Sequence, residues 1–466
     1  MTRLKFSTLF SMSAHMLASK KALIQSATLS SLMAFSTIVS AAPALGLLDI
    51  YQMASLQDAT LAQARAQHQS DLQGLTTARA ELLPSIKADA SYNVTDSSLD
   101  ISDVTTRDVS LTLNQSIYRH EVWVGYQQVE QALETSLYTL KTAEQELILR
   151  TTEHYFAVLL AQKTLMLFKA KEKSDLSQLE RAEASVEVGL ASRVDVLQAK
   201  SSYDLSKSER INAENSLDIS LEKLNRLTGK PIGELKAFPV KVSLPVVNLD
   251  IHQLEAQAVK QNLTVKRAMS QLQSAVLEIE VQKGGYWPAI NFQAKVSDTI
   301  YSDMNAGAAF NDSQRTTMGV TLSLPLFSGG STTSKVAAAR YQQTAAKEGL
   351  RNSQEEARLN VRVQARNLQR GESLVAALQE AVNSNDAFVE AAEESYKVGL
   401  NSLLEVLSAR SNQTVARKNL VEALHNQVLN KLRLESAVGN LTTEDLEAFD
   451  RLLQASEWVS LDQETM

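Results

Sequence analysis

The chain has 466 residues, of which 44% are hydrophobic, 21% charged and only 5% aromatic, and glycine and proline are scarce. This composition favours a mainly helical protein, and a net charge of −7 without a basic stripe argues against a nucleic-acid binder. The lack of cysteine excludes disulfides, thiolate catalysis and N-terminal lipidation, and the scattered histidines and acids form no recognisable catalytic, cofactor-binding or metal site.

A signal peptide for export is predicted at residues 1–42. Lys20 and Lys21 precede the apolar run Ala27–Val39, and Ser40-Ala41-Ala42 supplies the small residues that cleavage requires. After this segment, no apolar run is long enough for a membrane-spanning helix. We therefore expect the mature chain to leave the cytoplasm without a helical anchor.

A long helix and a hairpin are predicted next. Apolar residues at spacings of three and four indicate a helix over Leu48–Leu83, which Pro84 is expected to end. Apolar and polar residues then alternate over Ala88–Val94 and again over Val109–Ile117, on either side of a polar tip at Thr95–Thr106. Such alternation is what a membrane-spanning strand needs, and the two strands are predicted to form a hairpin.

Two more helices complete the first half of the chain. No Pro or Gly interrupts Tyr126–Val188, and a helix over Glu121–Glu187 would approach ~100 Å in length. A second helix is predicted over Ser192–Leu227, and an irregular connector begins at Gly229.

The second half repeats this order. Its predicted elements are a helix over Asp250–Gln282, a turn at Pro288, strands over Ile290–Val296 and Met318–Leu326, a helix to about Val398 and a helix over Ser402–Ala437. The repetition divides the chain into a signal peptide (1–42), a first repeat (43–247), a second repeat (248–440) and a C-terminal tail (441–466).

The sequence similarity between the halves is greatest at two Val-Gly-Leu turns. SVEVGLASRVDVLQAK at Ser185–Lys200 returns as SYKVGLNSLLEVLSAR at Ser395–Arg410, so that Gly399 lies 210 residues after Gly189. Such internal repetition indicates a duplicated architecture. Each Gly is expected to accept a positive φ, which ends one helix and lets the next begin at an angle.

The predicted strands are too few for one chain to enter a membrane alone. An open sheet cannot satisfy its edge N–H and C=O groups in hydrocarbon, and closed barrels need at least about eight strands. Because the chain offers four, several copies are expected to share one barrel. The long helices also need neighbours, because each carries an apolar stripe that must be covered along its length.

Short motifs occur in a fixed order along this duplicated plan. They are ELLPSI at Glu81–Ile86, LNQSIY at Leu113–Tyr118, VTLSLPLFSGG at Val320–Gly330 and the two Val-Gly-Leu turns. In this ordered set, the chain resembles the TolC family of outer-membrane channel proteins, which serve efflux and type I secretion. The resemblance covers essentially the whole chain after the signal peptide.

The resemblance implies a homotrimer in the outer membrane of a Gram-negative-type cell. Three chains would share a β-barrel of about twelve strands, continuous with a long α-helical barrel that extends into the periplasm. This duct would passively conduct drugs, other small molecules or secreted polypeptides from an inner-membrane transporter and a periplasmic adaptor to the exterior. The connector after Gly229 and the C-terminal tail would form equatorial elements around the helical barrel.

The resemblance also assigns a gate. In the family, two aspartates one helical turn apart form acidic rings after the second Val-Gly-Leu turn, and the matching residues here are Glu405 and Ser408, so one carboxylate ring is expected. A Tyr and an Arg of the family latch the closed mouth. The Tyr matches Tyr396, with Asp195 as its partner, but Asn401 occupies the Arg position. Since Asn cannot form a bidentate ion pair, we expect a looser latch.

A periplasmic coiled-coil adaptor or structural spacer is the alternative function. It explains the long helices but not the two hairpins at matching places. Asp195 and Glu405 would then be ordinary solvated helix residues, the usual fate of such carboxylates. Efflux and protein secretion are equally compatible with the sequence.

Overall fold

The computed structural model describes residues 44–95, 104–189, 191–237, 249–302, 312–451 and 453–455. The predicted signal peptide and the middle of the predicted polar tip at Thr95–Thr106 lie outside the described residues, as do residues 303–311 between the two strands of the second predicted hairpin. Within the described ranges, no helix is both long and apolar enough to cross a membrane.

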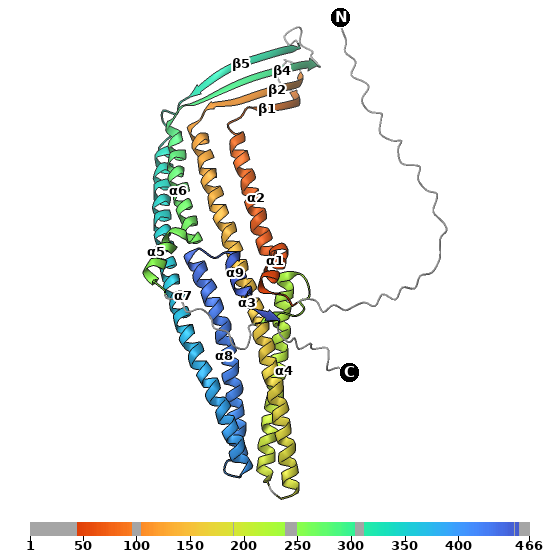
Figure 1. The fold of residues 1–466 in the computed structure, drawn as a ribbon. Coiled ribbons are helices and arrows are strands. Elements are labelled where there is room, and N and C mark those ends of the chain that lie inside the picture. Colours follow the sequence, from red (N-terminus) through yellow and green to blue (C-terminus); the bar gives the residue numbers. More distant parts are fainter. Residues whose placement is uncertain are drawn as a thin grey trace, which may run out of the picture. The chain divides into compact units, whose positions relative to one another are not determined.

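Two pairs of long helices dominate residues 43–466 (Figure 1). The first pair is α3 (His120–Glu187) with α4 (Arg193–Thr228), and the second is α7 (Ser331–Lys397) with α8 (Leu403–Val438). These bounds confirm the predicted helices to within one or two residues, because uninterrupted periodicity and the flanking glycines mark helix limits well.

The single helix predicted over Leu48–Leu83 is wrong, because the chain breaks at Asp58. It forms α1 (Leu47–Gln57) and α2 (Ala59–Ala80), and Asp58 between them is extended. The Asp58 carboxylate accepts a hydrogen bond from the Leu61 N–H at 2.8 Å. An Asx side chain that caps a new helix in this way competes with continuation of the old one.

The helix predicted over Asp250–Gln282 breaks in the same way. Asn262 separates α5 (Ile251–Gln261) from α6 (Leu263–Lys283), and its side-chain oxygen accepts the Thr264 N–H at 2.9 Å. Asn262 lies 204 residues after Asp58, the same separation as between Pro288 and Pro84. The break is therefore part of the duplication.

The two prolines lie where helices give way to strands. Pro84 directly precedes β1 (Ser85–Thr95), and Pro288 follows the short 3-10 helix η1 (Gly284–Tyr286) and directly precedes β4 (Ala289–Ser302).

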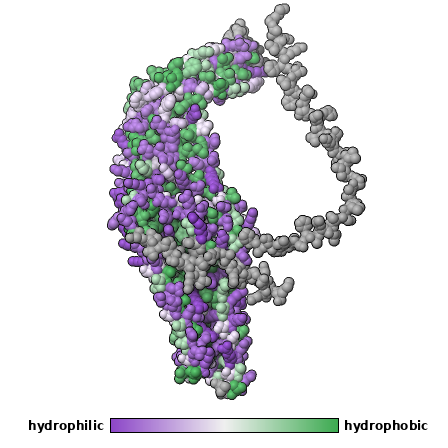
Figure 2. Space-filling model, viewed as in Figure 1, coloured by the Kyte–Doolittle hydropathy of each residue, from purple (hydrophilic) through white to green (hydrophobic). Residues whose placement is uncertain are grey.

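One four-stranded antiparallel sheet contains both predicted hairpins, which are confirmed. Its order is β1-β2-β4-β5, where β2 is Val104–Tyr118 and β5 is Ser313–Ser323. The pairing of β2 with β4 joins the halves of the chain, with Leu111 opposite Val296. In the view of Figure 2, hydrophobic side chains lie over these strands, in contrast to the polar surface of the helices below them.

The described residues of the connector and of the C-terminal tail meet beside the middle of the helices (Figure 1). Here β3 (Lys236–Ala237) pairs with β6 (Gln454–Ala455), and α9 (Thr443–Asp450) packs on α1. The buried Tyr155 hydroxyl of α3 donates to the Lys236 carbonyl at 2.6 Å. The main apolar core, drawn from α1, α3, α4, α8 and α9, surrounds this point.

Two glycines end corresponding helices in left-handed geometry. Gly229 ends α4 with φ +72°, and Gly439, which lies 210 residues later, ends α8 with φ +96°. Each packs against the helix break of its own half: a Cβ on Gly229 would meet the Gln57 side chain, and one on Gly439 would lie 2.5 Å from the Gln261 carbonyl oxygen. The second contact cannot relax easily, because the atoms of Gln261 and Asn262 that a Cβ would meet all belong to the backbone.

We expect Gly439→Ala to destabilise the protein by about 1–3 kcal/mol, because it adds positive-φ strain to a backbone clash. The matched control is Gly349→Ala within α7, where a Cβ has open space and the gain in helix propensity is about 0.5–1 kcal/mol. Chemical unfolding followed by circular dichroism measures both. Equal stability of the two variants would contradict this packing.

Candidate functional site

Both Val-Gly-Leu turns lie at the ends of the long helices that are remote from the sheet (Figure 1). Gly189 has φ +73° and Gly399 has φ +77°, a region that glycine enters without strain. Leu190 lies outside the described residues, but Val188 and Val398 are each 69% exposed and Leu400 is 80% exposed. The tip, by which we mean these two turns, therefore presents apolar side chains to its surroundings.

A serine caps the helix that follows each turn. Asp195 closes a capping box at the start of α4, where its Oδ2 accepts the backbone N–H and the hydroxyl of Ser192, both at 2.9 Å. At the start of α8, the Ser402 Oγ lies 3.4 Å from the Glu405 N–H. Within the described residues, the Glu405 carboxylate accepts no hydrogen bond, and its side chain is exposed. The two aligned carboxylates thus have different environments.

Glu405 begins a polar stripe along α8. Its exposed members, all polar except Val415, follow at alternating spacings of three and four residues: Glu405, Ser408, Asn412, Val415, Asn419, Glu422 and Asn426. This heptad spacing keeps one face in register when helices supercoil. Sequence reasoning identified only the first two members, although the same spacing could have identified the others.

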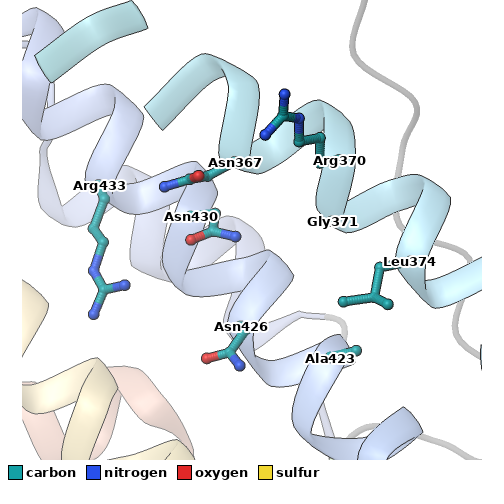
Figure 3. Close-up of a pocket in the computed structure, with 8 residues that line it drawn as sticks. All are labelled: Asn367, Arg370, Gly371, Leu374, Ala423, Asn426, Asn430 and Arg433. Carbon is teal, nitrogen blue, oxygen red and sulfur yellow. The ribbon is translucent and has the colours of Figure 1, made fainter. Parts of the chain in front are cut away.

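The polar stripe of α8 ends at a cavity of about 510 Å³ between α7 and α8. Gly371 allows the two helices to approach closely there, since a Cβ would collide with the Gln427 side chain. Figure 3 shows the amide side chains of Asn367 and Asn430 near each other, that of Asn426 further along α8, and two guanidinium groups directed away from each other. The guanidinium groups belong to Arg370 and Arg433.

Tyr396 packs where the two helix pairs meet above the tip. Its half-buried ring contacts two small apolar clusters, one of which joins α3 and α4 to α8 through Ala182, Ala199, Leu403 and Leu407. Among the hydrogen bonds of the described residues, none joins Tyr396 to Asp195. Asn401, the third residue assigned to the latch, is half-buried in the turn, and its N–H lies 3.4 Å from the Ser395 carbonyl oxygen.

Arg410 connects three helices, and sequence reasoning did not identify it. Its Nε lies 2.9 Å from Glu393 Oε1 of α7 and its Nη2 lies 2.7 Å from the same oxygen, while Nη1 donates to the Ser174 hydroxyl of α3. Ser174 and Arg410 are separated by 236 residues. No local pattern could reveal a contact between such distant segments.

A buried carboxylate lies beside Arg410. Asp175 is 2% exposed and lines a cavity of about 340 Å³ together with Lys171 and Arg410. Burial raises the pKa of Asp175, and the charge of Lys171, whose Nζ is 3.6 Å away, opposes this shift. Lys171 also pairs with Glu209 of α4 at 2.9 Å. This ionic cluster joins α3, α4 and α8 above the tip.

Comparison with known families supports the duplicated plan. The family described as "Outer membrane efflux protein" matches residues 50–230 and 254–440 of this chain. The two matched stretches contain the helix pairs and hairpins of the first and second halves.

Individual relatives are similar over nearly the whole length. Outer membrane protein TolC of Escherichia coli (strain K12) is 30% identical over 433 residues, which cover 91% of this chain and 87% of that protein. Proteases secretion protein PrtF of Dickeya chrysanthemi is 26% identical over 422 residues, covering 87% and 90%. The Campylobacter jejuni CmeC outer membrane channel shares the fold, with a TM-score of 0.74, 16% identity and coverage of 88% and 90%.

We expect Arg410→Gln to loosen the tip by about 1–2 kcal/mol, because it removes charge-assisted hydrogen bonds from a partly exposed pair. Hydrogen exchange should quicken at the ends of α7 and α8 but not in α5. The penalty should be largest at neutral pH. As the pH falls, Asp175, whose folded-state pKa is raised, takes up a proton and loses its electrostatic attraction to Arg410. Removal of Arg410 therefore costs less stability at low pH. Unchanged exchange at neutral pH would contradict the role of this contact.

Proposed function

This chain belongs to the outer membrane efflux protein family, and we propose that three copies of it form a gated duct that conducts substrates passively to the cell exterior. It is an outer-membrane protein of a Gram-negative cell. The family's name and the relative named for protease secretion support cargo that ranges from small molecules to polypeptides. Catalysis has no part in this proposal.

The observation that carries the proposal is a four-stranded sheet with two unpaired edges and an apolar face. Strands β1 and β5 are its edges. Exposed apolar residues on one face include Ile86, Val109, Leu111, Val296, Val320 and Leu322. In lipid, every edge N–H and C=O must be paired, so β5 of one copy would pair with β1 of the next. A periplasmic spacer has no use for such a face, and family membership also opposes that alternative.

Barrel closure and the resemblance support three copies. Two copies would supply the minimum of about eight strands, and three would supply the twelve that the TolC family implies. The long helices would then form a second barrel below the membrane, because α3, α4, α7 and α8 continue away from the sheet (Figure 1). We propose the repeats 43–247 and 248–440 as the two halves of each subunit, with 441–466 as the tail.

The tip supports partners in the periplasm. The exposed apolar residues at these helix ends are Val188, Val398 and Leu400. Exposure of apolar side chains to water is unfavourable, so such a patch indicates a protein–protein contact. We propose that a periplasmic adaptor covers them and links the duct to an inner-membrane transporter. Energy for transport would come from that transporter.

The gate is proposed at the start of the polar stripe of α8. Three Glu405 side chains would form one acidic ring, with Ser408 facing the lumen one turn further along. Asp195 Oδ2 is engaged by Ser192, which leaves Oδ1 to accept the Tyr396 hydroxyl in the closed duct. Asn401 would add no ionic bond, so the latch would depend on this single contact.

Planar-bilayer recording of the purified protein tests the duct and the ring together. We expect Glu405→Gln to weaken block by divalent cations at least severalfold, because a ring of carboxylates is lost, and Ser408→Asp to strengthen block by adding a second ring. Glu394→Gln is the control, since Glu394 is exposed on α7 and pairs with Lys397. A wild-type protein without conductance would refute the duct, and unaltered block in Glu405→Gln would refute the ring.

Tyr396→Phe tests the latch, because it keeps the aromatic ring of residue 396 in its apolar clusters and removes only the hydroxyl. We expect the open probability in the same recordings to rise severalfold, in line with the loss of one hydrogen bond of about 1 kcal/mol. Tyr341→Phe is the control, since Tyr341 is 78% exposed elsewhere on α7. Identical gating of wild type and Tyr396→Phe would exclude the latch.

A further inference from the structure

The strand register divides the sheet into two faces of different chemistry. Cross-strand pairs place Ala88 opposite Leu111 and Leu111 opposite Val296, so these residues share the apolar face. The other face is polar and internally bonded. Asp108 accepts from Thr299 at 2.8 Å, and Gln293 donates to Asn114 at 2.9 Å.

Arg107 is on the apolar face, where a charge is unexpected. It lies opposite Tyr92 on β1 and opposite Ile300 on β4. In the described strands it is the only basic residue of this face, because Lys87, Lys295 and Arg315 fall on the polar one. An arginine on a lipid-facing surface is costly unless it reaches the interface and a partner.

The Arg107 side chain is exposed and held by an aromatic ring. Its guanidinium carbon lies 5.7 Å from the centre of the Tyr92 ring. Within the described residues, it makes no ion pair. Asp298, the one acidic residue of this face in the described strands, lies diagonally across from it, opposite Val109. The five guanidinium N–H donors therefore remain available for an anion.

The depth of Arg107 matches the outer edge of a bilayer. It lies near the strand ends remote from the helices, eleven residues before Tyr118 at the helix-side end of β2. At ~3.4 Å per residue and a tilt of about 40°, this separation corresponds to roughly 28 Å along the membrane normal. The hydrocarbon core is about 30 Å thick. With the helices in the periplasm, Arg107 reaches the headgroups of the outer leaflet.

We propose that Arg107, oriented by Tyr92, binds the phosphate of an outer-leaflet lipid headgroup on the outside of the barrel. The inference rests on the proposed function, which defines the lipid-facing side. A guanidinium fork fits a phosphate through two parallel hydrogen bonds, and the cation–π contact with Tyr92 limits the freedom that binding must remove. Asp298, diagonally across from Arg107, would weaken phosphate binding by repulsion.

The test is native mass spectrometry of the purified oligomer titrated with lipid A, a bisphosphorylated glucosamine lipid. We expect Arg107→Gln to lower the apparent affinity about tenfold, as the loss of a charge-assisted bidentate contact implies. Arg107→Lys should fall in between, and Asp298→Asn should bind more tightly. Arg315→Gln is the matched control, since Arg315 is a strand arginine on the opposite face, and it should bind like wild type.

Several results would overturn the proposal. These are wild-type affinity in Arg107→Gln, an equal loss in Arg315→Gln, or no gain in Asp298→Asn. Displacement of the lipid by equimolar inorganic phosphate would show a free-phosphate site instead. If Arg107→Gln fails to assemble, Arg107→Lys and Asp298→Asn decide the question. Conductance in phosphatidylcholine bilayers, which contain no lipid A, should be the same in every variant as in the wild type. Absence of conductance in the wild-type protein would refute the duct, whereas the lipid contact is judged by the affinities alone.

Discussion

Unpaired backbone at the two edges of the sheet is the constraint on which the rest of the structure depends. Strands β1 and β5 each have a neighbour on one side only, and their apolar face belongs in lipid, where no water can complete the pairing. In the duct proposed above, closure would come from identical subunits. The same assembly would surround a lumen with the long helices, because α3 continues from β2 and α7 continues from β5.

The two halves of the chain share the same helix caps and helix ends, although the side chains that form them differ. Asp58 and Asn262 differ in charge, yet both cap the helix that follows a break. Gly229 and Gly439 both end a long helix against that break. In contrast, Asp195 closes a capping box at the tip and Glu405 does not. The halves thus share their scaffold and differ at the proposed gate.

The long helices, the two hairpins and the glycine turns could be predicted because each depends on local sequence. Periodicity and breakers are readable residue by residue. The breaks at Asp58 and Asn262 were missed because an Asx cap within an apolar pattern is a weak signal against helix continuation. The β2–β4 pairing and the contact of Arg410 with Ser174 join segments far apart in the chain. These contacts depend on tertiary packing, which cannot be read from any short stretch of a single sequence.

In the proposed duct the polar stripe of α8 would face the lumen, which has a consequence for what can travel past it. Asn412, Asn419 and Asn426 offer amides that both donate and accept, so each holds water about as well as it would hold a passing solute. This asparagine part of the wall would neither retain nor reject a cargo by charge, so that selection by charge would fall to Glu405 and Glu422. Breadth of cargo and speed of passage would then have one origin, which is the uncharged, well-hydrated asparagine surface between and beyond the two acidic positions.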